Sequence, residues 1–264
     1  RLLKRFEEAR PYYEFLVDYR LRKEGNSTNT FVVLKNLASL CSSLSDYTSK
    51  TLYYEKAWRM AREVLGNTHK DTLGVLSILV ASAEKSENYA LACEAKRAQI
   101  EHYTNTEGPG STKALVGFLK LAQLLELKKS PEDAEKLFLK NITDRKRVYG
   151  SETVRTAHAH SIYGQFLDRQ DRTNEAVMQL QIAADIREKA DPDNKNLLYA
   201  SYFRLADIYE KLRDDDKHKK YQKLADAIRK PSKKKSTSSK TAMKAPADKL
   251  KRTDKTKMTP VQDK

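Results

Sequence analysis

Helix-breaking residues recur at a nearly constant interval along this chain of 264 residues. Gly66, Gly108, Gly150 and Pro192 follow one another at intervals of 42 residues, and Gly25 precedes the first of them by 41. The chain has only 2 cysteines, so a disulfide framework does not account for this spacing. A fixed pitch of this kind is typical of stacked repeats, in which each unit buries its apolar surface against its neighbours.

Each unit is predicted to contain two amphipathic helices joined by a short polar turn. Between Gly66 and Gly108, apolar residues at helical spacing predict helices over residues 72–85 and about 89–103. The other units give predicted helix pairs at 29–44 and 47–64, 113–128 and 131–148, 155–169 and 174–190, and 197–212 and 216–229. With 8 Gly and 7 Pro among many strong helix formers, the composition favours an all-α class.

The first helices of five successive units align without gaps. Two columns of large residues and one adjacent column of small residues are expected to form the packed face of each helix. The columns are Leu34, Leu76, Phe118, His160 and Tyr202; Leu37, Leu79, Leu121, Tyr163 and Leu205; and Ala38, Val80, Ala122, Gly164 and Ala206. A small residue beside two large ones lets two helices approach closely, so these columns predict the helix crossings.

These columns resemble the tetratricopeptide repeat. The repeat length of 42 residues in this chain is longer than the usual length of that motif, which is about 34 residues. The segments VLGNTHKDT (64–72), FEEARPYYE (6–14) and YYEKAWRMAREVLG (53–66) resemble the kinesin-light-chain subclass. Its Leu-Gly-x-x-His-Pro-Asp, Asn-Asn-Leu-Ala and Tyr-x-x-Ala patterns are matched by Leu65, Gly66, His69 and Asp71, by Asn36, Leu37 and Ala38, and by Tyr89 and Ala92. The resemblance covers roughly residues 1–229. It implies a right-handed α-solenoid of antiparallel helix pairs that binds other proteins.

We expect the solenoid to span residues 1–230, as a half repeat at 1–25 followed by units at about 29–66, 71–108, 113–150, 155–192 and 197–229. Residues 1–25 resemble the second half of a unit and lack the first helix that would pair with them, so we expect the array to extend before residue 1. Residues 231–264 contain eleven Lys or Arg and three Asp with few large apolar residues. That composition predicts a disordered basic tail.

No catalytic, cofactor-binding or metal-binding motif is present in the sequence, so the prediction is a non-enzyme without a cofactor. His158 and His160 are two residues apart and therefore lie on different faces of a helix, and His160 belongs to a core column. Cys41 and Cys93 are predicted to be buried, reduced thiols. The aromatic residues predicted to pack between repeats are Tyr12, Tyr13, Tyr53, Tyr54 and Trp58.

A solenoid of helix pairs presents a concave wall that is made mainly by its first helices. The predicted wall positions lie two residues before and one, two and five residues after the first core column, and the side chains there are polar and slightly basic. This wall suits an acidic extended or helical peptide, although a plain solvated face is the alternative. The predicted groove residues are Lys35, Asn36, Ser39, Ser77, Lys120, Gln123, His158, Ser161, Gln165, Arg204 and Asp207.

Two main functions are compatible with these features. The first is a kinesin-light-chain-like adaptor or scaffold that holds a peptide or partner protein in its groove. The second is a structural subunit of a cytoskeletal or ribonucleoprotein assembly, anchored on nucleic acid phosphate or a microtubule surface by the tail residues Lys233, Lys234, Lys235, Lys249, Lys251 and Arg252. A regulatory repeat domain of an enzyme is a third. No membrane-spanning run is present, and we expect a cytoplasmic protein, with a nuclear or cytoskeleton-associated location as the alternative.

Overall fold

The computed structural model describes residues 2–229, while residue 1 and residues 230–264, including the predicted basic tail, lie outside the described part. Within residues 2–229 the chain forms eleven α-helices and no strand. The helices are α1 (Leu2–Glu24), α2 (Thr28–Ser43), α3 (Tyr47–Val64), α4 (Lys70–Lys85), α5 (Tyr89–Glu107), α6 (Thr112–Leu127), α7 (Pro131–Tyr149), α8 (Val154–Arg169), α9 (Thr173–Ala190), α10 (Lys195–Lys211) and α11 (Asp215–Arg229). The helix pairs expected from the sequence are present with ends within two residues, except that α5 continues to Glu107.

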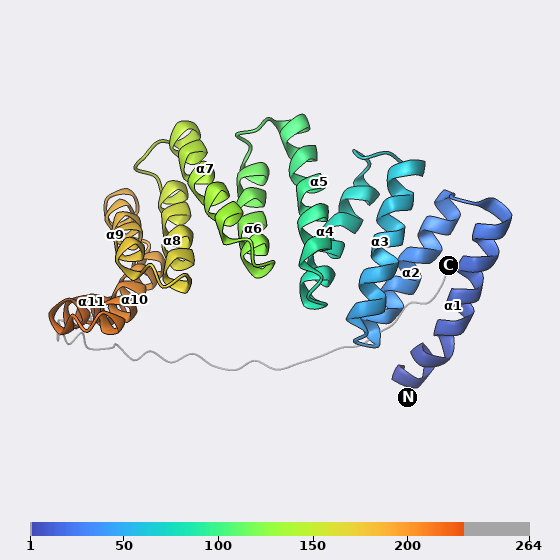
Figure 1. Ribbon diagram of the computed structural model, residues 1–264, viewed down its shortest axis with the longest axis horizontal. Coiled ribbons are helices and arrows are strands. Elements are labelled where there is room, and N and C mark those ends of the chain that lie inside the picture. The colour runs from blue at the N-terminus through green and yellow to red at the C-terminus, as the bar shows by residue number, and fades with distance from the viewer. Residues whose placement is uncertain (1, 230–264) are drawn as a thin grey trace, which may run out of the picture. The chain divides into compact units, whose positions relative to one another are not determined.

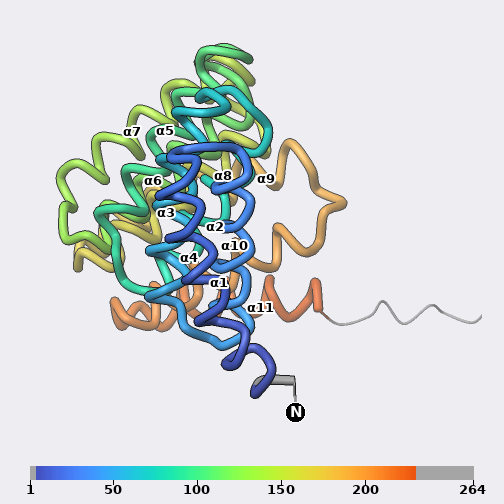
Figure 2. Tube along the Cα trace, turned by 90° about the vertical axis from the view of Figure 1, so that its right-hand side faces the viewer, coloured from blue at the N-terminus to red at the C-terminus, as the bar shows by residue number. Residues whose placement is uncertain are grey.

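The helices pack in chain order, because each one makes its main contacts with the helix before it and the helix after it. Within residues 2–229 the stack curves into an arch, with α4, α6 and α8 on the hollow side and α5 and α7 on the outer side (Figure 1). Viewed from the α1 end, the helices of successive units lie one behind another (Figure 2). The all-α solenoid predicted from the sequence is confirmed.

The core runs along the whole stack, from Val17 in α1 to Ala225 in α11. Both large columns and the small column of the first helices are buried or half-buried, and His160 is a packed core histidine as predicted. Trp58 and Tyr54 are also buried. The prediction was wrong for Tyr12, which is 77% exposed, because among the described residues no helix packs on its side of α1.

The turn inside each unit has the same backbone conformation in all five complete units. The second residue after the end of each first helix adopts a positive φ of 56–63° although it is never glycine. These residues are Ser45, Glu87, Lys129, Asp171 and Arg213. These positions follow one another at the 42-residue pitch. The next residue's N–H then bonds back five residues, as Ser130 N does to Leu125 O at 2.9 Å. This arrangement caps the carbonyl groups at the end of the first helix.

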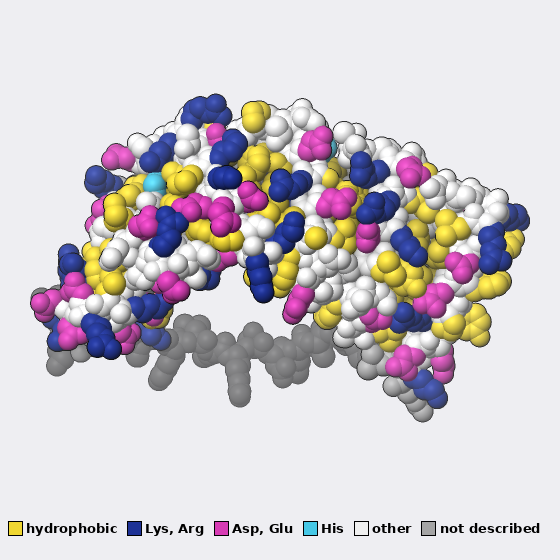
Figure 3. All heavy atoms as spheres, in the orientation of Figure 1, with side chains coloured by type: hydrophobic (Ala, Val, Ile, Leu, Met, Phe, Trp, Pro, Cys, Tyr) yellow, Lys and Arg dark blue, Asp and Glu magenta, His cyan; other side chains and the backbone are white. Residues whose placement is uncertain are grey.

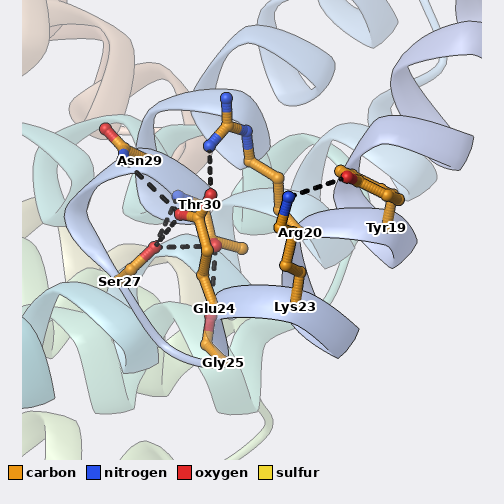
Figure 4. A network of polar contacts seen from close by, with 8 residues as sticks. All are labelled: Tyr19, Arg20, Lys23, Glu24, Gly25, Ser27, Asn29 and Thr30. Carbon is orange, nitrogen blue, oxygen red and sulfur yellow. Dashed lines mark hydrogen bonds and ion pairs between the residues drawn. The ribbon is translucent and has the colours of Figure 1, made fainter.

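Four of the five turns between units use glycine instead, and the turn between α9 and α10 contains none. Gly108 and Gly150 combine φ near +90° with ψ of 158° and 161°, a region open essentially to glycine alone. A buried threonine hydroxyl closes three of these turns by donating to the glycine carbonyl: Thr30 to Gly25 (3.1 Å), Thr72 to Gly66 (2.8 Å) and Thr156 to Gly150 (2.7 Å). At the first turn, Ser27 also caps α2 by accepting from Thr30 N at 3.1 Å (Figure 4).

Candidate partner-binding groove

The hollow side of the arch is formed by the first helices of the units, and the predicted groove residues lie along them. Five of these residues are exposed, five are half-buried, and one, Ser161, is buried. The exposed ones are Asn36, Ser39, Ser77, His158 and Asp207, and the half-buried ones are Lys35, Lys120, Gln123, Gln165 and Arg204. Their binding role stays a prediction.

Ser161 corrects one detail of the expected wall. It is only 2% exposed, because the side chain of Gln165, one turn further along α8, folds back over it. The Gln165 amide donates to Ser161 O at 2.9 Å and lies 3.5 Å from the Ser161 hydroxyl. Gln165 therefore presents its own side chain at this place in the groove, and Ser161 is covered.

The wall lysines are paired with carboxylates of neighbouring elements. Lys120 Nζ lies 2.7 Å from Glu84 in α4, and Lys35 Nζ lies 3.8 Å from Asp71. These pairs offset the basic character expected from the sequence. Figure 3 shows the same mixture, with Lys and Arg side chains beside Asp and Glu side chains along the arch.

Ion pairs join α6, α8 and α10, the first helices of the last three units, and these pairs form a ladder at one end of the groove. Arg169 in α8 makes a two-pronged contact with Glu126 in α6, at 2.8 Å for both bonds. Lys211 in α10 repeats the contact with Asp168 in α8 at 2.7 Å. Both pairs join residues 43 positions apart, so the ladder follows the repeat.

The exposed polar residue Ser77 is held by the second helix of its own unit. Its hydroxyl accepts from Gln99 Nε2 in α5 at 2.8 Å, and Gln99 Oε1 accepts from Lys96 Nζ at 2.6 Å. Burial lowers the pKa of Lys96, and the nearby charge of Lys120 lowers it further. This part of the wall is a fixed polar network.

A recess of the groove lies between α8 and α10 and is also lined by Leu180 of α9. Its volume is about 460 Å³, and its walls include Gln165, Arg204 and Asp207 from the predicted set. Tyr199 and Phe203, one turn apart on α10, stack at its edge with ring centroids 5.9 Å apart. Phe203 is 56% exposed, an unusual position for a phenylalanine in water.

Sequence reasoning missed the apolar part of this wall. Val32, Ile78, Val116 and Phe203 are all exposed on the first helices, between the polar residues that were predicted. Each occupies one of the offsets used to define the wall: Val32 and Val116 lie two before the first core column, Phe203 one after it and Ile78 two after it. The sequence therefore carries the signal, but the predicted groove set contains only the polar residues at those offsets.

A second recess, of about 280 Å³, lies between α3, α4 and α5 and is bounded by Trp58, Arg62 and His102. Arg62 lies 5.3 Å from the centroid of the Trp58 ring. Glu94, Arg97 and Glu101 also line the recess, so its charges are mixed. These residues define no particular ligand.

The histidines and cysteines assemble no reactive site in residues 2–229. Cys41 and Cys93 are free and buried, and burial raises the pKa of both thiols, which disfavours the nucleophilic thiolate. His160 Nδ1 lies 2.7 Å from Gln179 Oε1 within the core. In the described part of the chain, no three His, Cys, Asp or Glu side chains come together as metal ligands would. None of the described helices is long and apolar enough to cross a membrane.

Comparison with known proteins agrees with this geometry. The tetratricopeptide-repeat family profile matches residues 32–71, and no curated protein gives a significant match. Among solved structures, BtubC (BKLC) of P. vanneervenii is 17% identical over 96% of this chain and 97% of its own, with a TM-score of 0.56. A putative kinesin light chain of Podosopora anserina with nearly identical TPR-like repeats is 14% identical over 71% of this chain and 92% of its own, with a TM-score of 0.55. RapI in its apo form is 16% identical over 82% of this chain and 58% of its own, with a TM-score of 0.58.

At these identities the similarity to solved structures concerns the fold. The fold defines the class as an α-solenoid of stacked helix pairs. The repeat profile matches residues 32–71, and the solved structures with kinesin-light-chain-like repeats share the fold of the array. Proteins built of such repeats generally act as interaction scaffolds.

Proposed function

We propose that this protein is a non-enzymatic interaction scaffold that holds a segment of a partner protein against the hollow side of its arch. The observation that supports this most is the stacked pair Tyr199 and Phe203 at the edge of the recess between α8 and α10. Exposed aromatic side chains beside a pocket are typical of the anchor points of protein interfaces, because their burial by a partner is favourable.

The chemistry of the groove indicates what the partner offers. An apolar side chain fits the recess against Phe203 and Leu180, while Gln165 can form hydrogen bonds with a peptide backbone. Acidic groups fit beside Arg204, since Lys35 and Lys120 already have carboxylates of this chain as neighbours. The proposed partner is therefore a mainly apolar segment with an acidic flank.

Fold similarity to a putative kinesin light chain makes a cytoplasmic adaptor the natural form of this proposal. The alternative is a structural subunit of a larger assembly, cytoskeletal or ribonucleoprotein. The sequence of residues 231–264 favours it, because eleven cationic residues offer a salt-sensitive attachment to a polyanion. The alternative places the protein in the nucleus or on the cytoskeleton.

The proposal is tested by selecting peptides from a displayed library against the full chain and measuring the affinity of one selected peptide by calorimetry. Replacing Phe203 by Ala removes the aromatic anchor and should weaken binding by about tenfold or more, as loss of an interface anchor usually does.

Met178→Ala in α9 is the matched control, because Met178 is also a large exposed apolar residue, at 62%, but lies on a second helix. Its affinity should equal that of the unchanged protein. If Phe203→Ala binds the peptide as tightly as Met178→Ala, the recess is not the binding site, and failure to select any peptide also contradicts the proposal.

A further inference from the structure

The last unit, α10 and α11, forms one end of the array (Figure 1). Every second helix before it, from α1 to α9, packs against the first helix of the next unit. Among the described helices, α11 makes its main contacts with α10 alone. The sequence after α11 does not predict another unit, because Lys244 and Asp248 stand where the core columns require a large and a small apolar residue.

A recess of about 150 Å³ opens on the outer side of these two helices. Ala206 and Ala225 are 5% and 4% exposed there, and the stacked rings of Tyr199 and Phe203 also line it. The recess contains three carboxylates and one guanidinium group, so its charge is mainly negative. The surface around it, called the end face below, is formed by Tyr199, Phe203, Ala206, Asp207, Glu210, His218, Gln222, Ala225, Asp226 and Arg229.

The α10 side of the end face repeats a pattern of α6, two units earlier. In both helices two large apolar residues, one alanine and one glutamate follow one another at the same spacing. They are Tyr199, Phe203, Ala206 and Glu210 in α10, and Leu115, Leu119, Ala122 and Glu126 in α6. The three apolar residues of α6 are at most 6% exposed, whereas Phe203 is 56% exposed. In α10 the packing pattern is therefore present but uncovered.

Glu210 also continues the ladder of ion pairs. Glu126 binds Arg169 at 2.8 Å, and Asp168, 42 residues after Glu126, binds Lys211 at 2.7 Å. Both cations come from the first helix of the following unit. Glu210 lies 42 residues after Asp168, and in the described part of the chain no Lys, Arg or His nitrogen lies within 4.0 Å of its carboxylate. The ladder therefore ends in an open position for a cation.

The α11 side of the end face is more polar than the equivalent surface inside the array. Gln222 and Asp226 occupy the positions that Leu180 and Ala184 occupy in α9. Polar residues on the outer side of a terminal unit keep it soluble when no further unit covers it. The end face can therefore exist both free and covered, as the more polar surfaces of reversible interactions do.

We propose that the end face binds an amphipathic α-helix of a partner protein, in the place that the first helix of a next unit would take. The occupant is a helix because α8, a first helix, packs against α7 at the equivalent place in the array. Its apolar side contacts Phe203, and a Lys or Arg on it pairs with Glu210, as Lys211 pairs with Asp168. The excess of carboxylates around the recess favours the same basic helix.

This surface can be tested separately from the groove site of the proposed function. Tyr199, Phe203 and Asp207 line both recesses, but Glu210 and Asp226 line only the recess of the end face. A substitution of Glu210 therefore changes the end face and leaves the lining of the groove recess as it is.

The test begins with a library of amphipathic helices displayed on a small helical scaffold and selected against the full chain. One selected helix is then titrated into the full chain by calorimetry. Glu210→Lys should weaken its binding by about tenfold or more, because two cations then face each other. Replacing the facing cation of the helix by Glu should restore most of the affinity for the Glu210→Lys variant, as a direct charge pair requires.

Glu94→Lys is the matched control, because it makes the same change of charge at an exposed glutamate of α5. Its affinity for the selected helix should equal that of the unchanged protein. Circular dichroism checks that both variants are folded. Equal affinities of the Glu210→Lys and Glu94→Lys variants overturn the proposal, and so does a selection that yields no helix.

Sedimentation of the full chain without a partner tests a second copy as the occupant. A monomer is expected, because two end faces brought together would place their carboxylates against one another. A dimer that dissociates on Glu210→Lys substitution would assign the end face to a second copy and overturn the partner helix.

Discussion

Gly164 of α8 lies directly against Leu180 of α9, and a Cβ atom on Gly164 would come within 2.9 Å of Leu180 Cγ. It would also come within 3.1 Å of the backbone oxygen of Ala176, which has little freedom to move. Gly164→Ala should therefore destabilise the protein by about 1–3 kcal/mol, as overpacking of a helix crossing does. Urea unfolding followed by circular dichroism measures the change.

Gly74 of α4 provides the matched control for this substitution. It is also inside a helix, but a Cβ there meets nothing within 4 Å. Gly74→Ala should stabilise by up to about 1 kcal/mol, because alanine is the better helix former. If the two variants shift the unfolding midpoint in the same direction, the close contact between α8 and α9 is not as described.

The small column of the first helices gives a second prediction, at Ala122 in α6. Ala122 is fully buried, so Ala122→Leu should destabilise by about 1–3 kcal/mol. Ala81→Leu on α4 is the control, because Ala81 is exposed and the larger side chain meets solvent there. Equal thermal unfolding temperatures for the two variants would contradict the register of the repeat.

The turns inside the units predict a stabilising change. Lys129 has a φ of +63°, a conformation that is strained for residues with a Cβ atom. Lys129→Gly should stabilise by up to about 1 kcal/mol, the relief of strain exceeding the added freedom of the unfolded chain. The neighbouring Lys128 has φ −70°, so Lys128→Gly should instead destabilise by about 0.5–1 kcal/mol. Opposite signs in urea unfolding are expected, and two losses would contradict the turn conformation.

The buried His160 should make the stability of the folded protein depend on pH. Burial lowers its pKa in the folded protein, and its Nε2 is buried without a hydrogen-bond partner among the described residues. Below about pH 6.5 the unfolded chain binds a proton that the folded protein does not, so stability falls as the pH falls. Each unit by which the pKa is lowered corresponds to about 1.4 kcal/mol.

His160→Leu, which places a leucine in a column where Leu34 and Leu76 already stand, should remove this part of the pH dependence. Urea unfolding at neutral pH and at about pH 5, below the usual histidine pKa, measures it. Some dependence should remain, since the pKa of His158 is lowered as well. An unchanged difference between the two pH values would show that His160 titrates normally.

Much of the fold could be predicted because the repeat supplies five examples of each position. The columns of Leu37 and Ala38 place the core, and the glycine interval places the turns between units. The turns inside the units could not be recognised, because Lys129 and its equivalents are not residues that signal a positive φ. The exposure of Tyr12 was missed for a related reason: equivalent residues such as Tyr53 are covered by a neighbouring helix, and Tyr12 is not.

The groove could be predicted only in outline. Its position follows from the core columns, but the exposure and the ion pairing of each side chain depend on residues from other units. Lys120 meets Glu84, 36 positions away, so this ion pair is not visible in a local sequence pattern. The binding roles of the groove residues and of the tail remain predictions.

We propose that the protein recognises its partner in the groove of the array. The most direct test is the affinity of a library-selected peptide for the full chain at low and at high salt. The same measurement is made on a variant in which Lys233, Lys234, Lys235, Lys249, Lys251 and Arg252 are replaced by Ser. We predict a modest loss of affinity with salt and equal affinities for the two proteins, because a few partly buried contacts are weakly screened. A steep loss with salt, together with loss of binding in the Ser variant, would contradict groove recognition and favour attachment through the tail.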